Sequence, residues 1–110
     1  MDIFLHCKGI NWCCNIHTDE NDIFECCKKT FKMLFSHNTL SSDVTHLITI
    51  KIDKKKLYLI YEDCRTTSEN RKIILKDNQS LIYYLNYFID YSFSIAASEK
   101  HALFHGASLL

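Results

Sequence analysis

The chain has 110 residues, with 13 basic and 13 acidic side chains, only two glycines and no proline. This length suits one domain, and 47% hydrophobic with 24% charged residues is typical of a folded globule. The balanced charge disfavours nucleic-acid binding, and two glycines cannot build a phosphate-cradling loop. Walker-type ATPases and Rossmann oxidoreductases are therefore excluded.

Residues 3–17 are expected to form a β-hairpin that turns at Lys8-Gly9. If Cys7 pairs with Ile10, one face of both strands is entirely apolar, which supports this register. The apolar face carries Ile3, Leu5, Cys7, Ile10, Trp12, Cys14 and Ile16. The other face carries Phe4, His6, Asn11, Cys13, Asn15 and His17.

A first helix is predicted to follow the acidic, cap-forming segment 18–22 and to end near residues 36–38. Its apolar residues recur at helical spacing and predict one buried face. They are Ile23, Cys27, Phe31 and Leu34, flanked by Phe24 and Phe35.

A second hairpin is predicted over residues 48–61, because apolar side chains alternate on both of its strands. A turn at residues 53–56 pairs Ile52 with Leu57 and places all six apolar side chains on one face. They are Ile48, Ile50, Ile52, Leu57, Leu59 and Tyr61. The run at residues 73–75 predicts a third strand of this group.

A long helix is predicted from about Gln79 to Ser98, capped by Asp77 or Asn78. Its expected buried stripe is Leu81, Leu85, Phe88, Ile89 and Ile95. Four tyrosines cover much of the remaining surface: Tyr83, Tyr84, Tyr87 and Tyr91. Tyrosine is favoured at protein interfaces, so these four are the candidate partner-binding residues, with plain burial as the alternative.

The last ten residues are expected to form a strand that begins at about residue 101. The apolar end at Leu109-Leu110 suggests that another chain covers this edge or that the reading frame continues. The predicted fold is therefore a single α+β domain over residues 1–110. Its order is β-β-α-β-β-β-α-β, with antiparallel hairpins packed against two helices.

The cytoplasm is the expected compartment, because the N-terminus lacks the basic start and apolar run of a secretory signal. Polar residues interrupt the apolar segment 81–97, so no membrane span is expected. Six cysteines without an export signal are expected to stay reduced.

The cysteines show no metal-ligand spacing, since they include the adjacent doublets Cys13-Cys14 and Cys26-Cys27 but no C-x-x-C. Neighbouring strand residues point to opposite faces, so structural thiols are favoured, and no metal or cofactor is expected. A thiol nucleophile at Cys13 with His6 or His17 as base remains an alternative. Two lysine groups, at residues 28–32 and 54–56, are interpreted as solvated surface rather than as a nucleic-acid site.

The segment Leu103-Phe104-His105-Gly106-Ala107, together with the order of elements, resembles the leading part of HPr-kinase-like proteins. The hydrophobic hairpin, the Asp-rich turn at residues 18–22 and the aromatic helix are similar to the peptide-modification branch of that family. By this resemblance, His105 matches the family's active-site histidine. The family's phosphate-binding loop is not found in these 110 residues, so a catalytic role of His105 is only latent.

The sequence therefore predicts a non-catalytic domain that binds a protein or peptide partner, as the accessory N-terminal part of an HPr-kinase-like protein. Kinase activity would require a phosphate-binding loop outside this chain. Two alternatives remain: a small interaction or inhibitor protein that homodimerises, and a thiol- or metal-dependent enzyme.

Overall fold

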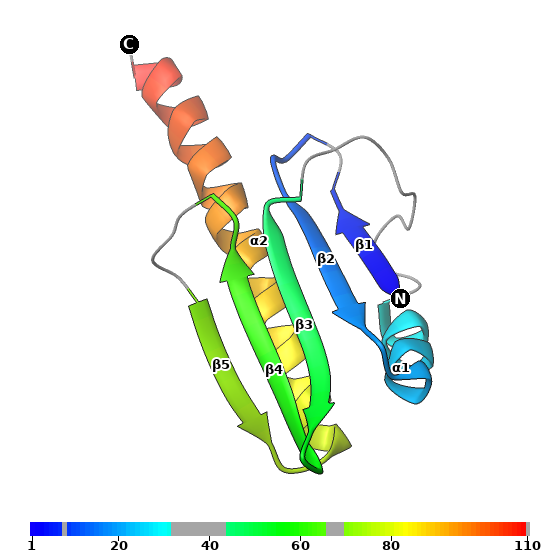
Figure 1. Ribbon diagram of the computed structural model, residues 1–110. Helices are drawn as coiled ribbons and strands as arrows, with labels where there is room; N and C mark the ends of the chain where they lie inside the picture. Colours follow the sequence, from blue (N-terminus) through cyan, green and yellow to red (C-terminus); the bar gives the residue numbers. More distant parts are fainter. Residues whose placement is uncertain (8, 32–43, 66–69, 110) are drawn as a thin grey trace.

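The fold is a five-stranded sheet with two helices on one face, which confirms the expected α+β class (Figure 1). The computed structural model describes residues 1–7, 9–31, 44–65 and 70–109, with side chains up to Ser98. The strands are β1 (Asp2–His6), β2 (Cys13–Thr18), β3 (His46–Asp53), β4 (Lys56–Asp63) and β5 (Asn70–Leu75). The helices are α1 (Asn21–Phe31) and α2 (Asn78–Leu109).

The strands lie in chain order across the sheet, so β1 and β5 are its two outer strands. Neighbouring strands are antiparallel except β2 and β3, which are parallel. A parallel pair needs a crossover connection, and the segment that contains α1 supplies it. The two expected hairpins are thus joined into one mixed sheet.

The register of the second hairpin is confirmed, since Ile52 pairs with Leu57. The turn itself consists of Lys54 and Lys55, whose φ angles are 50° and 65°. Two positive φ values define a type I′ turn, whose twist matches that of the strands. Lysine reaches this conformation less readily than the Asn-Gly pairs that such turns prefer.

The register expected for the first hairpin is wrong by two residues. Leu5 pairs with Cys14 and His6 with Cys13, while Ile10 and Cys7 belong to a wider connection. Because side chains alternate with a period of two, this shift leaves the same residues facing the core. The Ile10 N–H still donates to the Cys7 carbonyl oxygen at 3.3 Å.

The second helix begins with the expected side-chain cap, whereas the first is preceded by a side-chain turn at Thr18. Thr18 Oγ1 accepts a hydrogen bond from the Glu20 N–H (3.1 Å) before α1, and Asp77 Oδ1 accepts one from the Ser80 N–H (2.8 Å) at α2. The expected end of the first helix, near residues 36–38, lies outside the described residues.

The expected last strand is wrong, because α2 continues as one helix to Leu109. The segment from Glu99 to Leu103 contains good helix formers and no proline, so nothing there ends the helix. The last turns of α2 extend past the end of the sheet (Figure 1).

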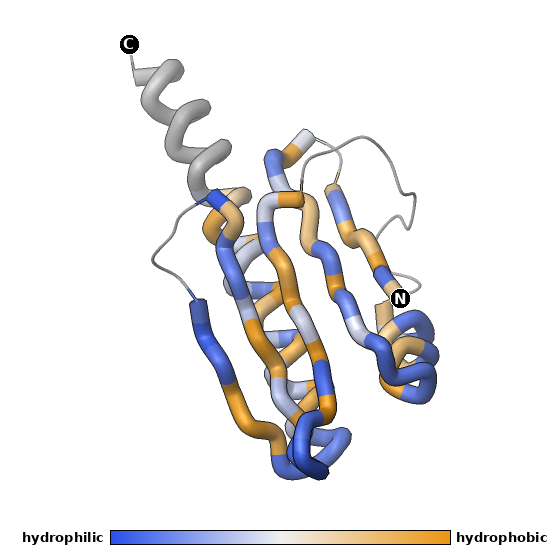
Figure 2. The backbone as a smooth tube through the Cα atoms, viewed as in Figure 1, coloured by the Kyte–Doolittle hydropathy of each residue, from blue (hydrophilic) through white to orange (hydrophobic). Residues whose placement is uncertain are grey.

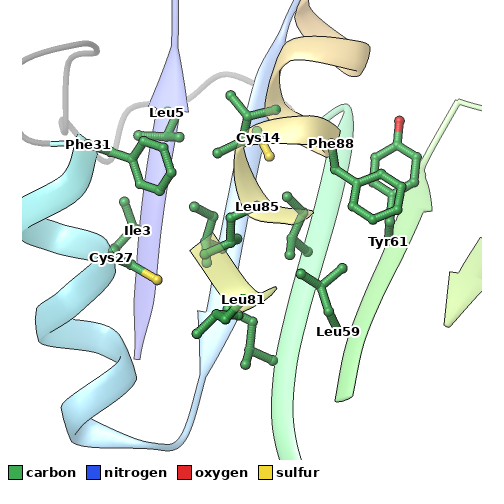
Figure 3. Packing of buried hydrophobic residues seen from close by; sticks show 14 of the residues in the cluster. Ile3, Leu5, Cys14, Cys27, Phe31, Leu59, Tyr61, Leu81, Leu85 and Phe88 are labelled. Atoms are coloured by element: carbon green, nitrogen blue, oxygen red, sulfur yellow. The ribbon is translucent and has the colours of Figure 1, made fainter. Parts of the chain in front are cut away.

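The core lies between the helices and one face of the sheet, and all five strands and both helices contribute to it. Phe31 and Cys27 of α1 pack near Ile3 and Leu5, as Figure 3 shows. Tyr61 stacks on Phe88 of α2 with ring centroids 4.7 Å apart. This packing fixes the position of α2 relative to β4 and β5.

Candidate functional site

The hydrogen bonding of β5 follows from the turn of the neighbouring hairpin. Asp53 and Lys56 flank a two-residue turn and therefore form a hydrogen-bonded pair. Hydrogen-bonded pairs alternate along an antiparallel ladder, so even-numbered residues of β4 bond to β3. The odd-numbered residues Leu57, Leu59 and Tyr61 consequently bond to β5.

Half of the backbone groups of β5 point away from the sheet. The β5 partners of the odd-numbered β4 residues are Arg71, Ile73 and Leu75. Lys72 and Ile74 alternate with them, so their N–H and C=O groups face the outer edge. An outer strand with such groups is a template for another strand.

The tyrosines predicted to bind a partner lie along this edge. Tyr83 is 65% exposed and Tyr87 43% exposed, whereas Tyr84 and Tyr91 are half-buried. Tyr87 and Tyr91 stack with their ring centroids 6.2 Å apart. The structure thus places two of the four tyrosines at the surface, and the other two partly in the core.

The tyrosines and β5 run side by side over matching lengths. At one end, the Arg71 guanidinium lies 6.0 Å from the ring centroid of Tyr91. At the other end, a shallow pocket of about 440 Å³ is lined by Ile74 and by Tyr83 and Tyr84. The eight helical steps from Tyr83 to Tyr91 span about 12 Å, and the three strand steps from Arg71 to Ile74 span about 10 Å. We call this surface, formed by β5 and the four tyrosines, the β5 edge.

The β5 edge is polar at one end and apolar at the other, as Figure 2 shows for the strand itself. Arg71 and Lys72 lie in its polar half, and Lys76 follows directly after the strand. Ile74, in its apolar half, is 60% exposed. The tyrosines were predicted from the sequence, but the basic residues were not, although the run Arg71-Lys72 before three apolar residues was a signal for them.

A second polar group lies inside the protein, and its members were not recognised from the sequence. His46 is fully buried at the start of β3, and its Nδ1 lies 2.8 Å from Thr45 Oγ1. The Thr45 hydroxyl donates to the Cys13 carbonyl oxygen at 3.1 Å, so the proton between Thr45 and the ring belongs to Nδ1. His46 Nε2 then faces Asp63 (3.7 Å) and Arg65 (3.5 Å).

Asp63 is the charged centre of this group and is 6% exposed. Burial alone raises its pKa, but side-chain and backbone hydrogen bonds from Arg65 and the nearby His46 and Arg65 charges lower it overall. The carboxylate is therefore ionised and holds the ends of β3 and β4 together. A histidine this buried cannot reach a substrate, so we assign the group a structural role.

Four of the thiols lack the environment of a nucleophile. Burial raises the pKa of the Cys13 thiol, and burial with the nearby Glu62 and Asp63 charges raises that of Cys64. Burial raises the pKa of Cys27 to about 12, and burial also raises the pKa of Cys14. A reactive thiol needs a lowered pKa, so these four cysteines have structural character.

The candidate Cys–His pair is only partly assembled. His6 is the cross-strand partner of Cys13, whereas His17 lies at the far end of β2. His17 Nδ1 instead contacts Asp2 Oδ1 at 2.8 Å. Among the described residues, no group of three or more His, Cys, Asp or Glu side chains could hold a metal ion.

The remaining sequence candidates lie apart from the β5 edge. His105 is in the last turns of α2, and its side chain lies outside the described part of the chain. Lys54, Lys55 and Lys56 are exposed in the β3–β4 turn, as expected. Within the described ranges, no helix is long and apolar enough to cross a membrane.

A second pocket, of about 260 Å³, lies between the starts of both helices and the β3–β4 turn. Its apolar residues include Ile23, Leu57 and Leu81, and its rim carries Glu20 and Lys55. The opposite charges on this rim favour no particular class of ligand.

Comparisons of the chain with protein-family models, curated proteins and solved structures give no match. The function is therefore inferred from the geometry of the β5 edge.

Proposed function

We propose that this chain is a non-catalytic domain that binds an extended peptide segment of a partner protein at the β5 edge. One observation carries the proposal: an outer strand with outward-facing backbone groups lies beside exposed tyrosines of α2. An extended peptide can add to such a strand through main-chain hydrogen bonds. Its side chains on the helix side would then contact Tyr83 and Tyr87.

The proposal includes no chemical step in this chain. The raised thiol pKa values and the burial of His46 favour binding over catalysis. An accessory role in an HPr-kinase-like protein is part of the proposal, although the His105 segment is helical here and not the strand that the resemblance implied. Six cysteine thiols without disulfides fit the reducing cytoplasm that we propose as the compartment.

A proline at an outward-facing position of β5 tests the proposal. Ile74→Pro removes an outward N–H and leaves the bonds between β4 and β5 intact, because Ile74 does not donate to β4. Peptides would first be selected on the wild-type chain from a phage-displayed random library. Their affinities for wild type, Ile74→Pro and the control Ile74→Val would then be measured by fluorescence anisotropy.

We expect the selected peptides to bind wild type and Ile74→Val alike and to lose at least tenfold in affinity for Ile74→Pro. Circular dichroism and thermal unfolding would establish that the proline variant is folded. Failure to select any peptide, or equal affinity for all three proteins, would refute binding at the β5 edge.

A further inference from the structure

The charges of β5 identify the chemistry of the peptide. Arg71, Lys72 and Lys76 place three cations along and directly after the strand, and all three are exposed. Asp77 directly follows Lys76 and lines the same pocket, so the positive charge that an acidic partner would match rests mainly on Arg71 and Lys72. Complementary charge in a binding partner increases both its specificity and its rate of association.

The two cations within β5 lie on opposite faces of the sheet. Lys72 is on the face without helices, where its Nζ lies 4.5 Å from the ring centroid of Tyr58. Arg71 is on the helix face, beside Tyr91. Residues that pair directly across two strands share a face, so a peptide residue opposite Lys72 would also point away from the helices.

The helix face of an added strand meets a different surface. There, Tyr83 is 65% exposed, and it lines the pocket beside β5 together with Tyr84. Aromatic or aliphatic side chains gain most from contact with such rings. On the face without helices the peptide therefore meets Lys72 and then Ile74, and on the helix face it meets Arg71 and then Tyr83.

A second copy of this chain fits the β5 edge less well. The outward-facing residues must pair with each other, so a two-fold pairing of β5 with itself is centred on a residue. Centred on Lys72, Ile73 or Ile74, it places Lys72 opposite Lys72, Ile74 or Lys76 of the second copy, and none of these is acidic. Like charges on neighbouring strands are destabilising. Charge complementarity thus favours an acidic peptide over homodimerisation.

We infer that the β5 edge takes an extended peptide with acidic residues in one half and aromatic or aliphatic residues in the other. The acidic residues face Arg71 and Lys72, and the apolar residues face Ile74 and Tyr83. This inference rests on the proposed function, because it specifies the chemistry of the peptide that binds there.

Two synthetic peptides of about ten residues, each with a fluorescent label, test the inference. One carries glutamates in one half and valine and tyrosine in the other half, and the second peptide has lysine in place of each glutamate. Their affinities would be measured by anisotropy for wild type, for Lys72→Glu and for the control Lys29→Glu. Lys29 is an exposed lysine of α1, remote in sequence from β5. Lys29→Glu therefore changes the net charge by the same amount as Lys72→Glu, but away from β5.

We expect wild type and Lys29→Glu to prefer the acidic peptide by about tenfold, with a preference that weakens as salt rises. Lys72→Glu should lose or reverse this preference. Equal binding of both peptides, with Ile74→Pro still inactive, would refute the acidic preference and leave strand addition intact. Binding of neither synthetic peptide by wild type would also refute the acidic preference, while the library selection tests strand addition independently.

Two further results would overturn the inference. A labelled oligouridine that binds wild type more tightly than the acidic peptide would show that the cations serve a nucleic acid. Dimerisation of wild type in native mass spectrometry, abolished by Ile74→Pro, would show that a second copy occupies the β5 edge.

Discussion

The two outer strands of the sheet differ in how deeply their apolar side chains are buried. Ile3 and Leu5 of β1 are 5% and 0% exposed, because α1 packs Phe31 against this end of the core. At the opposite side, Ile74 of β5 and Tyr83 of α2 are 60% and 65% exposed. Exposed apolar surface at an outer strand invites association, so its occurrence at β5 points to a binding role there.

Polar contacts reinforce the difference. Asp2 of β1 accepts a hydrogen bond from Asn15 and contacts His17, and the N-terminal ammonium donates to the Thr18 carbonyl oxygen at 3.0 Å. These contacts hold β1 to β2. The cations of β5 instead lie beside aromatic rings, where they remain accessible to an acidic partner.

The largest effect on stability is expected at β1, the outer strand that α1 covers. Phe31→Ala removes a fully buried ring beside β1 and should lower the free energy of unfolding by about 3–5 kcal/mol. Urea denaturation followed by circular dichroism measures this loss. A change below about 1 kcal/mol would show that α1 does not cover β1 as tightly as the structure indicates.

A substitution of Asp63, at the end of β4, tests the buried polar group that it forms with His46 and Arg65. Asp63→Asn removes the charge that faces His46 and Arg65, and should cost about 2 kcal/mol at pH 7. The pKa of Asp63 is lower in the folded than in the unfolded protein, so its stabilisation is complete above the unfolded pKa of about 3.9 and is lost as the pH falls through the folded pKa.

The difference in stability between wild type and Asp63→Asn should therefore stay nearly constant from pH 6 to about 4.5 and shrink as the pH is lowered below about 4. Urea denaturation across this range measures it. A difference that stays constant at the lower pH as well would mean that the carboxylate charge contributes nothing and that only its shape matters.

The β3–β4 turn offers a stabilising change that touches neither outer strand. Replacing Lys54 by Asn and Lys55 by Gly should raise the free energy of unfolding by about 1 kcal/mol, because Asn and Gly adopt positive φ more readily. Thermal unfolding measures the effect, and peptide affinity should not change. A decrease in melting temperature would contradict the type I′ geometry.

The smallest effect on stability is expected at the β5 edge. Tyr83→Ser should change the free energy of unfolding by no more than about 0.5 kcal/mol, because the ring is mostly exposed. The same change should weaken selected peptides several-fold in anisotropy measurements. The matched variant Tyr83→Phe, which keeps the ring, should retain binding, and a loss there equal to that of serine would argue against apolar contact.

Regular alternation and helical spacing made much of the fold predictable. The six alternating residues from Ile48 to Tyr61 determined both the face and the register of the second hairpin, because a two-residue turn allows only one pairing. In the first hairpin, alternation determined the face but could not distinguish registers that differ by two residues. The helical continuation at residues 101–109 was missed because a short apolar run does not distinguish strand from helix.

The candidate site was predictable only in part. Clustering of four tyrosines on one helix identified the aromatic half of the β5 edge. The contribution of Arg71 and Lys72 depends on β5 being an outer strand, which is a property of the whole sheet. The buried group around His46 was hidden for the same reason, since its members are far apart in the sequence and meet only where two strands end.

Amide hydrogen exchange of β5, with and without the acidic peptide, tests the central claim most directly. The N–H groups of Lys72 and Ile74 face outward, whereas those of Arg71 and Ile73 already bond to β4 and serve as internal controls. We predict that the peptide slows exchange at Lys72 and Ile74 and leaves the β1 amides unchanged. Protection that appears at β1, or that spares Lys72 and Ile74 while the peptide is bound, would contradict strand addition at β5.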